Sequence, residues 1–165
     1  MNKSDTILII EDEMIIAANI SLQLTNLGFK VDGIITKSED VMPHLLVHIP
    51  DIILMDINLK GKTDGIELAQ LIQKEYKIPI IYLTANSDEA HFERAKATNP
   101  YAFISKPFKK LDLQHAIELT LIRIHEEQLK DKNLVLTTEE PYILSDCIFV
   151  RSHDKMVKVC INNIL

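Results

Sequence analysis

Residues 52–56 have the sequence IILMD, in which four apolar side chains are followed by Asp56. Short apolar runs without alternation are typical of strands that are buried on both faces of a parallel sheet. Runs of the same kind occur at residues 6–10, 80–83 and 102–104, with a weaker one at 29–35. The stretch that ends at Asp56 is therefore one of five predicted strands, and their repetition indicates an α/β fold.

Amphipathic segments separate these runs. They carry apolar residues at spacings of three and four, which indicates helices, and Gly28 follows the first of them as a stop signal. The predicted helices cover residues 14–27, 38–48, 65–76, 87–98 and 111–129. Five strand–helix units in series predict a doubly wound, flavodoxin-like parallel sheet with the strand order 2-1-3-4-5.

The composition is that of a globular protein with a small surplus beyond one domain. The chain has 165 residues, of which 47% are hydrophobic and 25% charged, and its formal net charge is −6. It has no apolar run of about 18 residues that could span a membrane, and its beginning lacks the features of a signal peptide. With two cysteines it has no disulfide framework, so we expect a cytoplasmic protein without a membrane partner.

Residues with reactive side chains follow the predicted strands. Glu11 and Asp12 follow the first, Asp56 the third, Thr84 the fourth and Lys106 the fifth. Because the carboxyl ends of parallel strands meet at one edge of the sheet, we expect these side chains to converge. Three adjacent carboxylates favour a hard divalent cation such as Mg²⁺. Each residue alone could be a helix cap or a turn residue, but together they suit phosphoryl transfer onto an aspartate.

Residues 5–129 resemble the receiver domain of two-component response regulators. The resemblance implies that Asp56 accepts a phosphoryl group from a sensor histidine kinase. It also implies that Mg²⁺ is held by Asp12, by Glu11 mainly through water, by Asp56 and by the backbone carbonyl of Asn58. The stretches that carry it are LIIEDE at 8–13, ILMDINL at 53–59, DGIELA at 64–69, IIYLTA at 80–85 and FISKPF at 103–108.

The same resemblance implies the parts of a switch. Lys106 would contact the phosphoryl group, and its peptide bond to Pro107 would be cis. Thr84 and Phe103 would move after phosphoryl transfer, together with residues 85–88 and the fourth helix. The surface formed by helix 4, strand 5 and helix 5 would then control the output and could form a homodimer.

An enzyme is the less favoured interpretation. Phosphohydrolases that form an aspartyl phosphate usually carry a second acid two residues after the nucleophile. This chain has Asn58 at that position, which cannot act as a general acid. We therefore expect a phosphoacceptor switch with at most weak autodephosphorylation.

The sequence departs from the common receiver pattern in three places. Lys60 stands where many receivers have proline, and the segment from Asp56 to Gly65 is longer by one residue than the commonest spacing. The switch aromatic is Phe103 rather than tyrosine, and Asn99 with the following proline replaces the usual glycine–alanine before the fifth strand. We expect the phosphoacceptor function to survive, with the phosphoryl lifetime and the choice of kinase open to change.

Residues 143–165 resemble the opening of a LytTR-type DNA-binding domain, on the stretches DCIFVRS at 146–152 and MVKVCINNIL at 156–165. The expected organisation is a receiver at 1–130, a linker at 131–142 and an N-terminal fragment of the second domain at 143–165. The chain would then be a truncated transcriptional regulator that binds DNA only at full length. The alternative is a receiver that acts only through protein contacts, with the tail as an accessory hairpin.

Overall fold

A computed structural model of the chain describes residues 5–85, 89–135, 147–152 and 155–160. The chain divides into two compact units, residues 1–124 and 125–165. The first unit contains a parallel sheet with the strand order β2-β1-β3-β4-β5, which confirms the predicted flavodoxin-like fold. Its strands are β1 (Thr6–Ile10), β2 (Lys30–Ile35), β3 (Ile52–Asp56), β4 (Ile80–Ala85) and β5 (Ala102–Lys106).

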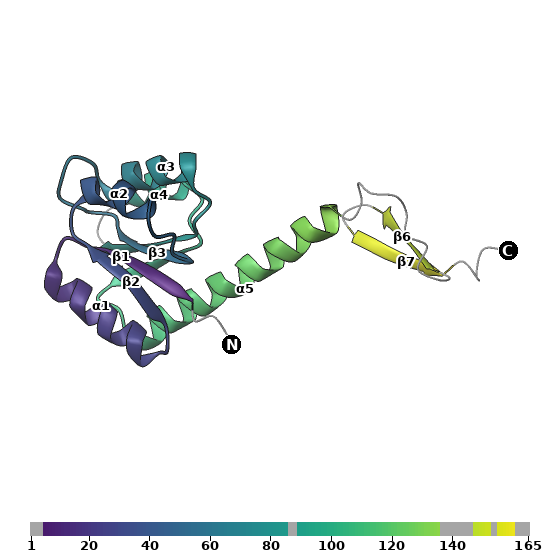
Figure 1. The fold of residues 1–165 in the computed structure, drawn as a ribbon, viewed down its shortest axis with the longest axis horizontal. Coiled ribbons are helices and arrows are strands. Elements are labelled where there is room, and N and C mark those ends of the chain that lie inside the picture. The colour runs from purple at the N-terminus through teal and green to yellow at the C-terminus, as the bar shows by residue number, and fades with distance from the viewer. Residues whose placement is uncertain (1–4, 86–88, 136–146, 153–154, 161–165) are drawn as a thin grey trace. The chain divides into compact units, whose positions relative to one another are not determined.

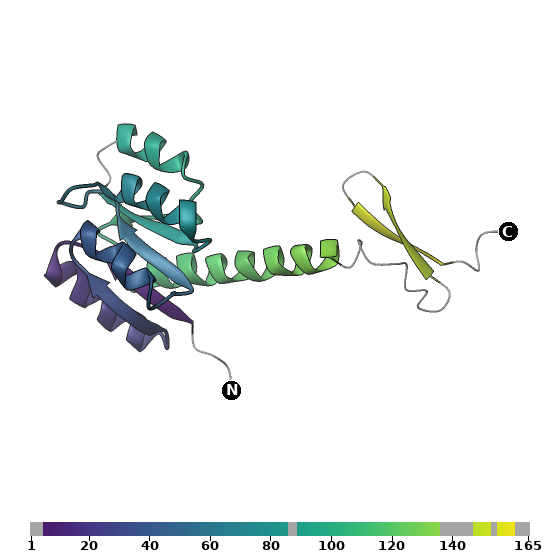
Figure 2. The same ribbon diagram turned by 45° about the horizontal axis from the view of Figure 1, so that its top comes forward.

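Helices cover both faces of this sheet. In Figure 1, α2, α3 and α4 lie above the sheet, whereas α1 and the first turns of α5 lie below it, and the turned view in Figure 2 keeps this separation. None of the helices in the described part of the chain is long and apolar enough to cross a membrane. The helices are α1 (Met14–Asn26), the 3-10 turn η1 (Ser38–Asp40), α2 (Val41–Leu45), α3 (Gly65–Glu75), α4 (Glu89–Lys96) and α5 (Lys110–Val135).

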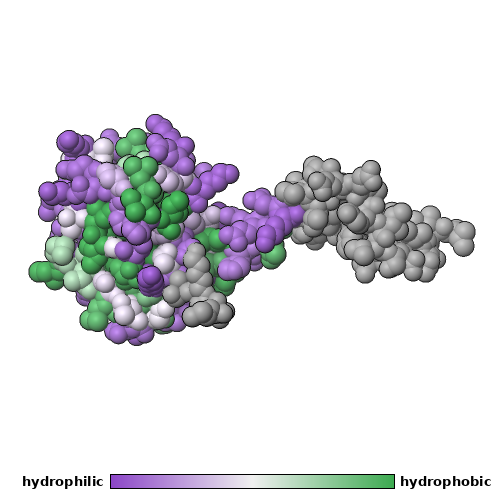
Figure 3. All heavy atoms as spheres, viewed as in Figure 1, coloured by the Kyte–Doolittle hydropathy of each residue, from purple (hydrophilic) through white to green (hydrophobic). Residues whose placement is uncertain are grey.

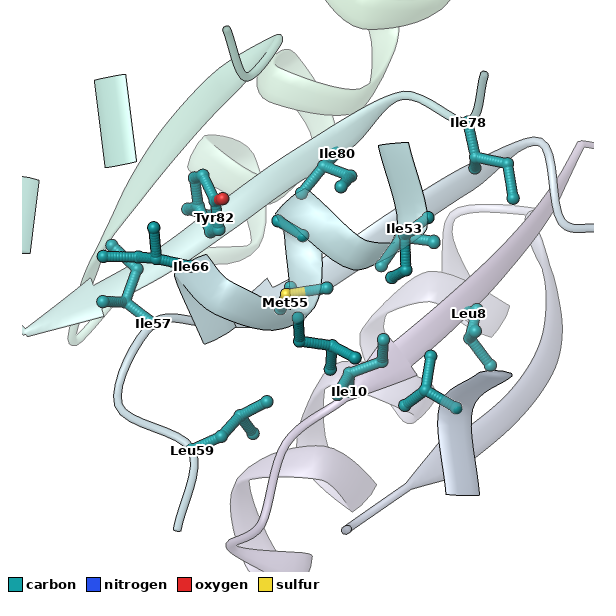
Figure 4. Close-up of a cluster of buried hydrophobic side chains, with 14 of the residues drawn as sticks. Leu8, Ile10, Ile53, Met55, Ile57, Leu59, Ile66, Ile78, Ile80 and Tyr82 are labelled. Carbon is teal, nitrogen blue, oxygen red and sulfur yellow. The ribbon is translucent and has the colours of Figure 1, made fainter. Parts of the chain in front are cut away.

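The strands are buried on both faces because their residues alternate between two hydrophobic clusters. Leu8 and Ile10 of β1 belong to the first cluster, under α2, α3 and α4, whereas Ile7 and Ile9 belong to the second, against α1 and α5. Figure 4 shows the first cluster, in which residues of β1, β3 and β4 meet Ile66 of α3. Continuous apolar runs are therefore needed here, since each strand faces two cores.

Some helices end at other positions than the sequence predicts. α2 ends at Leu45 rather than at residue 48, and Leu46, Val47 and Ile49, which follow it, are exposed. Figure 3 shows patches of hydrophobic side chains among hydrophilic ones on one face of the first unit. α1 ends as predicted before Gly28, whose φ of 90° lies in the region that glycine favours.

The last helix is longer than predicted. α5 continues to Val135, because no glycine or proline interrupts the sequence between Pro107 and Pro141. Residues 131–135 of the expected linker are therefore helical, and residues 136–142 lie outside the described residues. The first residues of the predicted helix at 87–98, and most of the predicted mobile segment at 85–88, also lie outside them.

The second unit contains an antiparallel pair of strands, β6 (Cys147–Ser152) and β7 (Lys155–Cys160). The backbone register sets Cys147 opposite Cys160 and Ser152 opposite Lys155. Both strands lie within the predicted fragment at 143–165. Residues 143–146, 153–154 and 161–165 of the predicted fragment lie outside the described residues.

Candidate functional site

Three carboxylates meet at the carboxyl edge of the sheet. Glu11 and Asp12 follow β1, Asp56 is the last residue of β3, and β1 pairs directly with β3, with Ile10 opposite Met55. One carboxylate oxygen from each of the three lies within 4.8 Å of the others. Glu11 and Asp56 are buried, and Asp12 is half-buried. The strand order thus assembles an oxygen donor set of the kind that Mg²⁺ prefers.

Lys106 partly neutralises this cluster. It is the last residue of β5, and its Nζ donates a hydrogen bond of 2.7 Å to Oε2 of Glu11 and lies 3.1 Å from Oδ2 of Asp56. Its side chain is only 17% exposed, so water screens these interactions less than at the surface. One ammonium group is shared by two buried carboxylates, which leaves net negative charge for a further cation.

The pKa values of Glu11 and Lys106 are shifted by burial and by the contacts between the charged groups. Burial raises the pKa of Glu11, the hydrogen bond from Lys106 partly offsets this, and the charge of Asp56 raises the pKa further. Burial by itself would lower the pKa of Lys106, but the hydrogen bond to Glu11 and the charge of Asp56 outweigh it and raise the pKa above its ordinary value. Lys106 is therefore a fixed positive charge beside Asp56 at neutral pH.

Local backbone contacts position Asp56. The backbone N–H of Asn58 donates a hydrogen bond of 3.1 Å to Oδ1 of Asp56. At the start of α3, a Cβ added to Gly65 would collide with the backbone carbonyl oxygen of Asp56, and the N–H of Gly65 donates to the carbonyl of Ile57 at 3.0 Å. The sequence analysis did not predict this close approach, which only a residue without a side chain permits.

Thr84 and Phe103 lie on the paired strands β4 and β5 but have different surroundings. The hydroxyl of Thr84, near the end of β4, donates to the carbonyl of Ala85 at 3.2 Å. The half-buried ring of Phe103 in β5 lies 5.6 Å from the ring of Tyr82 and 4.6 Å from that of Phe92 in α4, measured between centroids. Phe103 is therefore packed between the sheet and α4.

Tyr82 links β4 to the end of α4. Its buried hydroxyl shares a hydrogen bond of 2.8 Å with Oγ1 of Thr98, which in turn donates to the carbonyl of Ala95 at 2.7 Å. Burial raises the pKa of Tyr82, so the hydroxyl stays protonated at neutral pH.

Beside the site, the peptide bond between Lys106 and Pro107 is cis.

Lys60 was noted in the sequence only as a departure from a common pattern. In the structure its Nζ lies 3.7 Å from Oδ2 of Asp12. Nothing in the local sequence indicates this contact, because the two residues are far apart along the chain and meet only through the strand order.

Comparison with protein families gives the class of this protein. Residues 7–118 match the model of the response regulator receiver domain. Together with the flavodoxin-like sheet and the acidic cluster at its carboxyl edge, this match shows that the chain belongs to the receiver family of two-component systems.

Individual relatives agree with this class. The chain is 33% identical over 120 residues to "Transcriptional regulatory protein PdtaR" of Mycobacterium tuberculosis (strain CDC 1551 / Oshkosh), an alignment that covers 73% of this chain and 58% of the relative. The chain thus spans little more than half of that relative's length.

Solved structures of receiver domains are similar as well. The signal receiver domain of a modulated diguanylate cyclase from Desulfovibrio desulfuricans G20 is 34% identical, with a TM-score of 0.70, over 78% of this chain and 99% of that one. The N-terminal domain of a response regulator/sensory box/GGDEF protein from Carboxydothermus hydrogenoformans is 30% identical, with a TM-score of 0.68, over 75% of this chain and 98% of that one.

Proposed function

We propose that this protein is a phosphorylation-driven switch in which Asp56 accepts a phosphoryl group from a sensor histidine kinase. The observation that carries the proposal is the contact of 3.1 Å between Lys106 Nζ and Asp56 Oδ2, beside the carboxylates of Glu11 and Asp12. An acceptor carboxylate, a fixed ammonium group and a set of oxygen ligands are the components that phosphoryl transfer to aspartate requires.

The residues of the site have distinct roles in this reaction. An oxygen of Asp56 forms the new bond to phosphorus, while the bond between phosphorus and the kinase's histidine nitrogen breaks and that nitrogen keeps the electron pair. Lys106 neutralises a phosphoryl oxygen. Mg²⁺, held by Glu11, Asp12, Asp56 and the backbone carbonyl of Asn58, would neutralise charge on the transferring group when bound.

The added charge would act on the face formed by α4, β5 and α5. An aspartyl phosphate adds charge and strong acceptor oxygens beside Thr84, and we propose that Thr84 and Phe103 respond to it. The packing of Phe103 against Phe92 supports a connection to α4. Exposed apolar residues of α5, among them Leu111 and Leu119, support a homodimer through this face.

We further propose that the full-length protein controls transcription in the cytoplasm through a LytTR-type DNA-binding domain that begins at residue 143. The antiparallel pair of β6 and β7 is compatible with such a beginning, and one relative is named a transcriptional regulatory protein. The alternative output is protein contact alone. A basic, strand-rich continuation of the reading frame would support the DNA-binding output, and a stop codon at position 166 would support the alternative.

Phosphorylation of purified protein tests the acceptor. Incubation with Mg²⁺ and a small phosphodonor should add one phosphoryl group to the wild type, measured by intact mass. Asp56→Asn should gain none, because its amide oxygen is a poor nucleophile. Asp40→Asn, which changes an exposed aspartate outside the site, should be labelled like the wild type. Equal labelling of Asp56→Asn and wild type would refute the assignment.

A further inference from the structure

We infer that Lys60 is a counter-ion of Asp12 that competes with Mg²⁺ for the acidic site. It would thereby raise the Mg²⁺ concentration at which the site is occupied. The inference rests on the proposed function of this site, and it concerns a residue that the phosphoryl transfer described above does not use.

The first support is the way in which two lysines are distributed over the three carboxylates. Lys106 is nearly buried and contacts Glu11 and Asp56. Lys60 approaches Asp12 instead, with a distance of 3.7 Å between Nζ and Oδ2. The side chain of Lys60 is 83% exposed, whereas that of Asp12 is 12% exposed. The ammonium group therefore reaches Asp12 from the solvent side.

The second support is the backbone on either side of Lys60. Leu59 is buried in the first hydrophobic cluster, as Figure 4 shows, and it holds the segment after β3 against the core. Gly61 has a φ of 152°, and a Cβ at this position would lie 3.1 Å from Oγ of Ser38. The segment thus passes close to the residues that follow β2, so the backbone of Lys60 is constrained on both sides.

The consequence follows from charge. Asp12 must offer a carboxylate oxygen to a divalent cation, and an ammonium group beside that oxygen repels the cation and stabilises the metal-free carboxylate. Water screens an exposed pair strongly, so Lys60 modulates binding and does not abolish it. We expect the dissociation constant for Mg²⁺ to fall about two- to fivefold when this charge is removed.

The test is calorimetric titration of MgCl₂ into the metal-free, unphosphorylated full chain at low ionic strength. Lys60→Gln should bind Mg²⁺ more tightly than the wild type, and Lys60→Arg, which keeps the charge, should bind like the wild type. Lys62→Gln is the matched control, because it removes the same charge from an exposed lysine two residues further along. The difference between Lys60→Gln and wild type should shrink at high salt.

The outcomes separate this inference from the proposed function. If the wild type binds Mg²⁺ and Lys60→Gln binds it equally or more weakly, the inference is wrong and the proposed metal site stands. An equal gain in Lys62→Gln would also overturn it, since general charge would then explain the effect. If neither the wild type nor any variant binds Mg²⁺, the proposed metal site fails, and the inference fails with it.

Discussion

Glu11 is the acidic residue of the site that is most completely removed from solvent. Its side chain is inaccessible, one of its oxygens accepts the bond from Lys106, and the other accepts the backbone N–H of Glu13 at 3.1 Å. These bonds hold the carboxylate at the start of the loop after β1. Its pKa is nevertheless raised, because burial outweighs the bonds that favour the charged form.

A pH dependence of stability follows from this shift. The folded state binds the Glu11 proton more tightly than the unfolded chain, so wild-type stability falls as pH rises from the ordinary pKa of 4.5 through the raised folded value. Glu11→Gln cannot ionise and avoids this loss. As pH rises above 4.5, the free energy of unfolding of Glu11→Gln minus that of the wild type should therefore become more positive. Urea denaturation in metal-free buffer at several pH values measures this difference.

The control for this measurement is Glu75→Gln, an exposed glutamate at the end of α3. Its stability relative to the wild type should change little with pH. The raised pKa of Lys106 does not interfere, because its contribution is lost only as pH rises through a folded value above 10.5. A difference between Glu11→Gln and wild type that stays constant with pH would contradict the explanation by burial.

At the scale of elements, the start of α3 is defined by a reciprocal cap. Oδ1 of Asp64 accepts the backbone N–H groups of Ile66 at 2.9 Å and Glu67 at 2.8 Å, and Oε2 of Glu67 accepts the N–H of Asp64 at 3.1 Å. This capping box begins the helix at Gly65, directly against the backbone of Asp56. Oδ2 of Asp64 also lies 3.1 Å from Nη2 of Arg94 in α4.

Removing the cap should therefore cost more than removing the ion pair. We expect Asp64→Ala to lower the free energy of unfolding by about 1–2 kcal/mol, because two N–H groups of α3 lose their acceptor. Arg94→Ala, which removes only the partly exposed ion pair, should cost less than about 1 kcal/mol. Urea denaturation of both variants measures the difference. Equal losses would mean that the contact between α3 and α4, rather than the cap, is the stabilising feature.

At the scale of the whole molecule, both hydrophobic clusters belong to the first unit. Their buried members run from Ile7 in β1 to Ile117 in α5, with Ile124 packed at the edge of the second cluster. Among the residues whose burial the structure describes, every member of the two clusters thus precedes the expected linker at residue 131. This supports the domain boundary that we propose from the sequence.

A fragment covering residues 1–130 should accordingly unfold at the same urea midpoint as the full chain, within error, when followed by circular dichroism. A fragment ending at residue 112 should fail to fold cooperatively, because it lacks Leu113 and Ile117 of the second cluster. A markedly lower midpoint for residues 1–130 would show that residues 131–165 stabilise the receiver.

The sequence by itself determined the strand order and the acidic cluster, because both depend on strong and local signals. Strands buried on both faces require continuous apolar runs, and a reactive residue directly after such a run must lie at the carboxyl edge of the sheet. For this reason Glu11, Asp12 and Asp56 could be predicted to converge. The spacing of Asp64 and Glu67 is also that of a capping box, although the sequence analysis did not predict this cap.

Only the tertiary structure decided which charges and surfaces meet. The sequence placed Lys106 near the carboxylates, but only the fold shows that it bonds Glu11, 95 positions away. The approach of Lys60 to Asp12 has no sequence signal at all. The same holds for the glycine at position 65, whose need for close approach depends on where Asp56 lies. Side-chain partners in a folded protein are set by packing between distant segments, whereas the period and ends of its elements are set mainly by neighbouring residues.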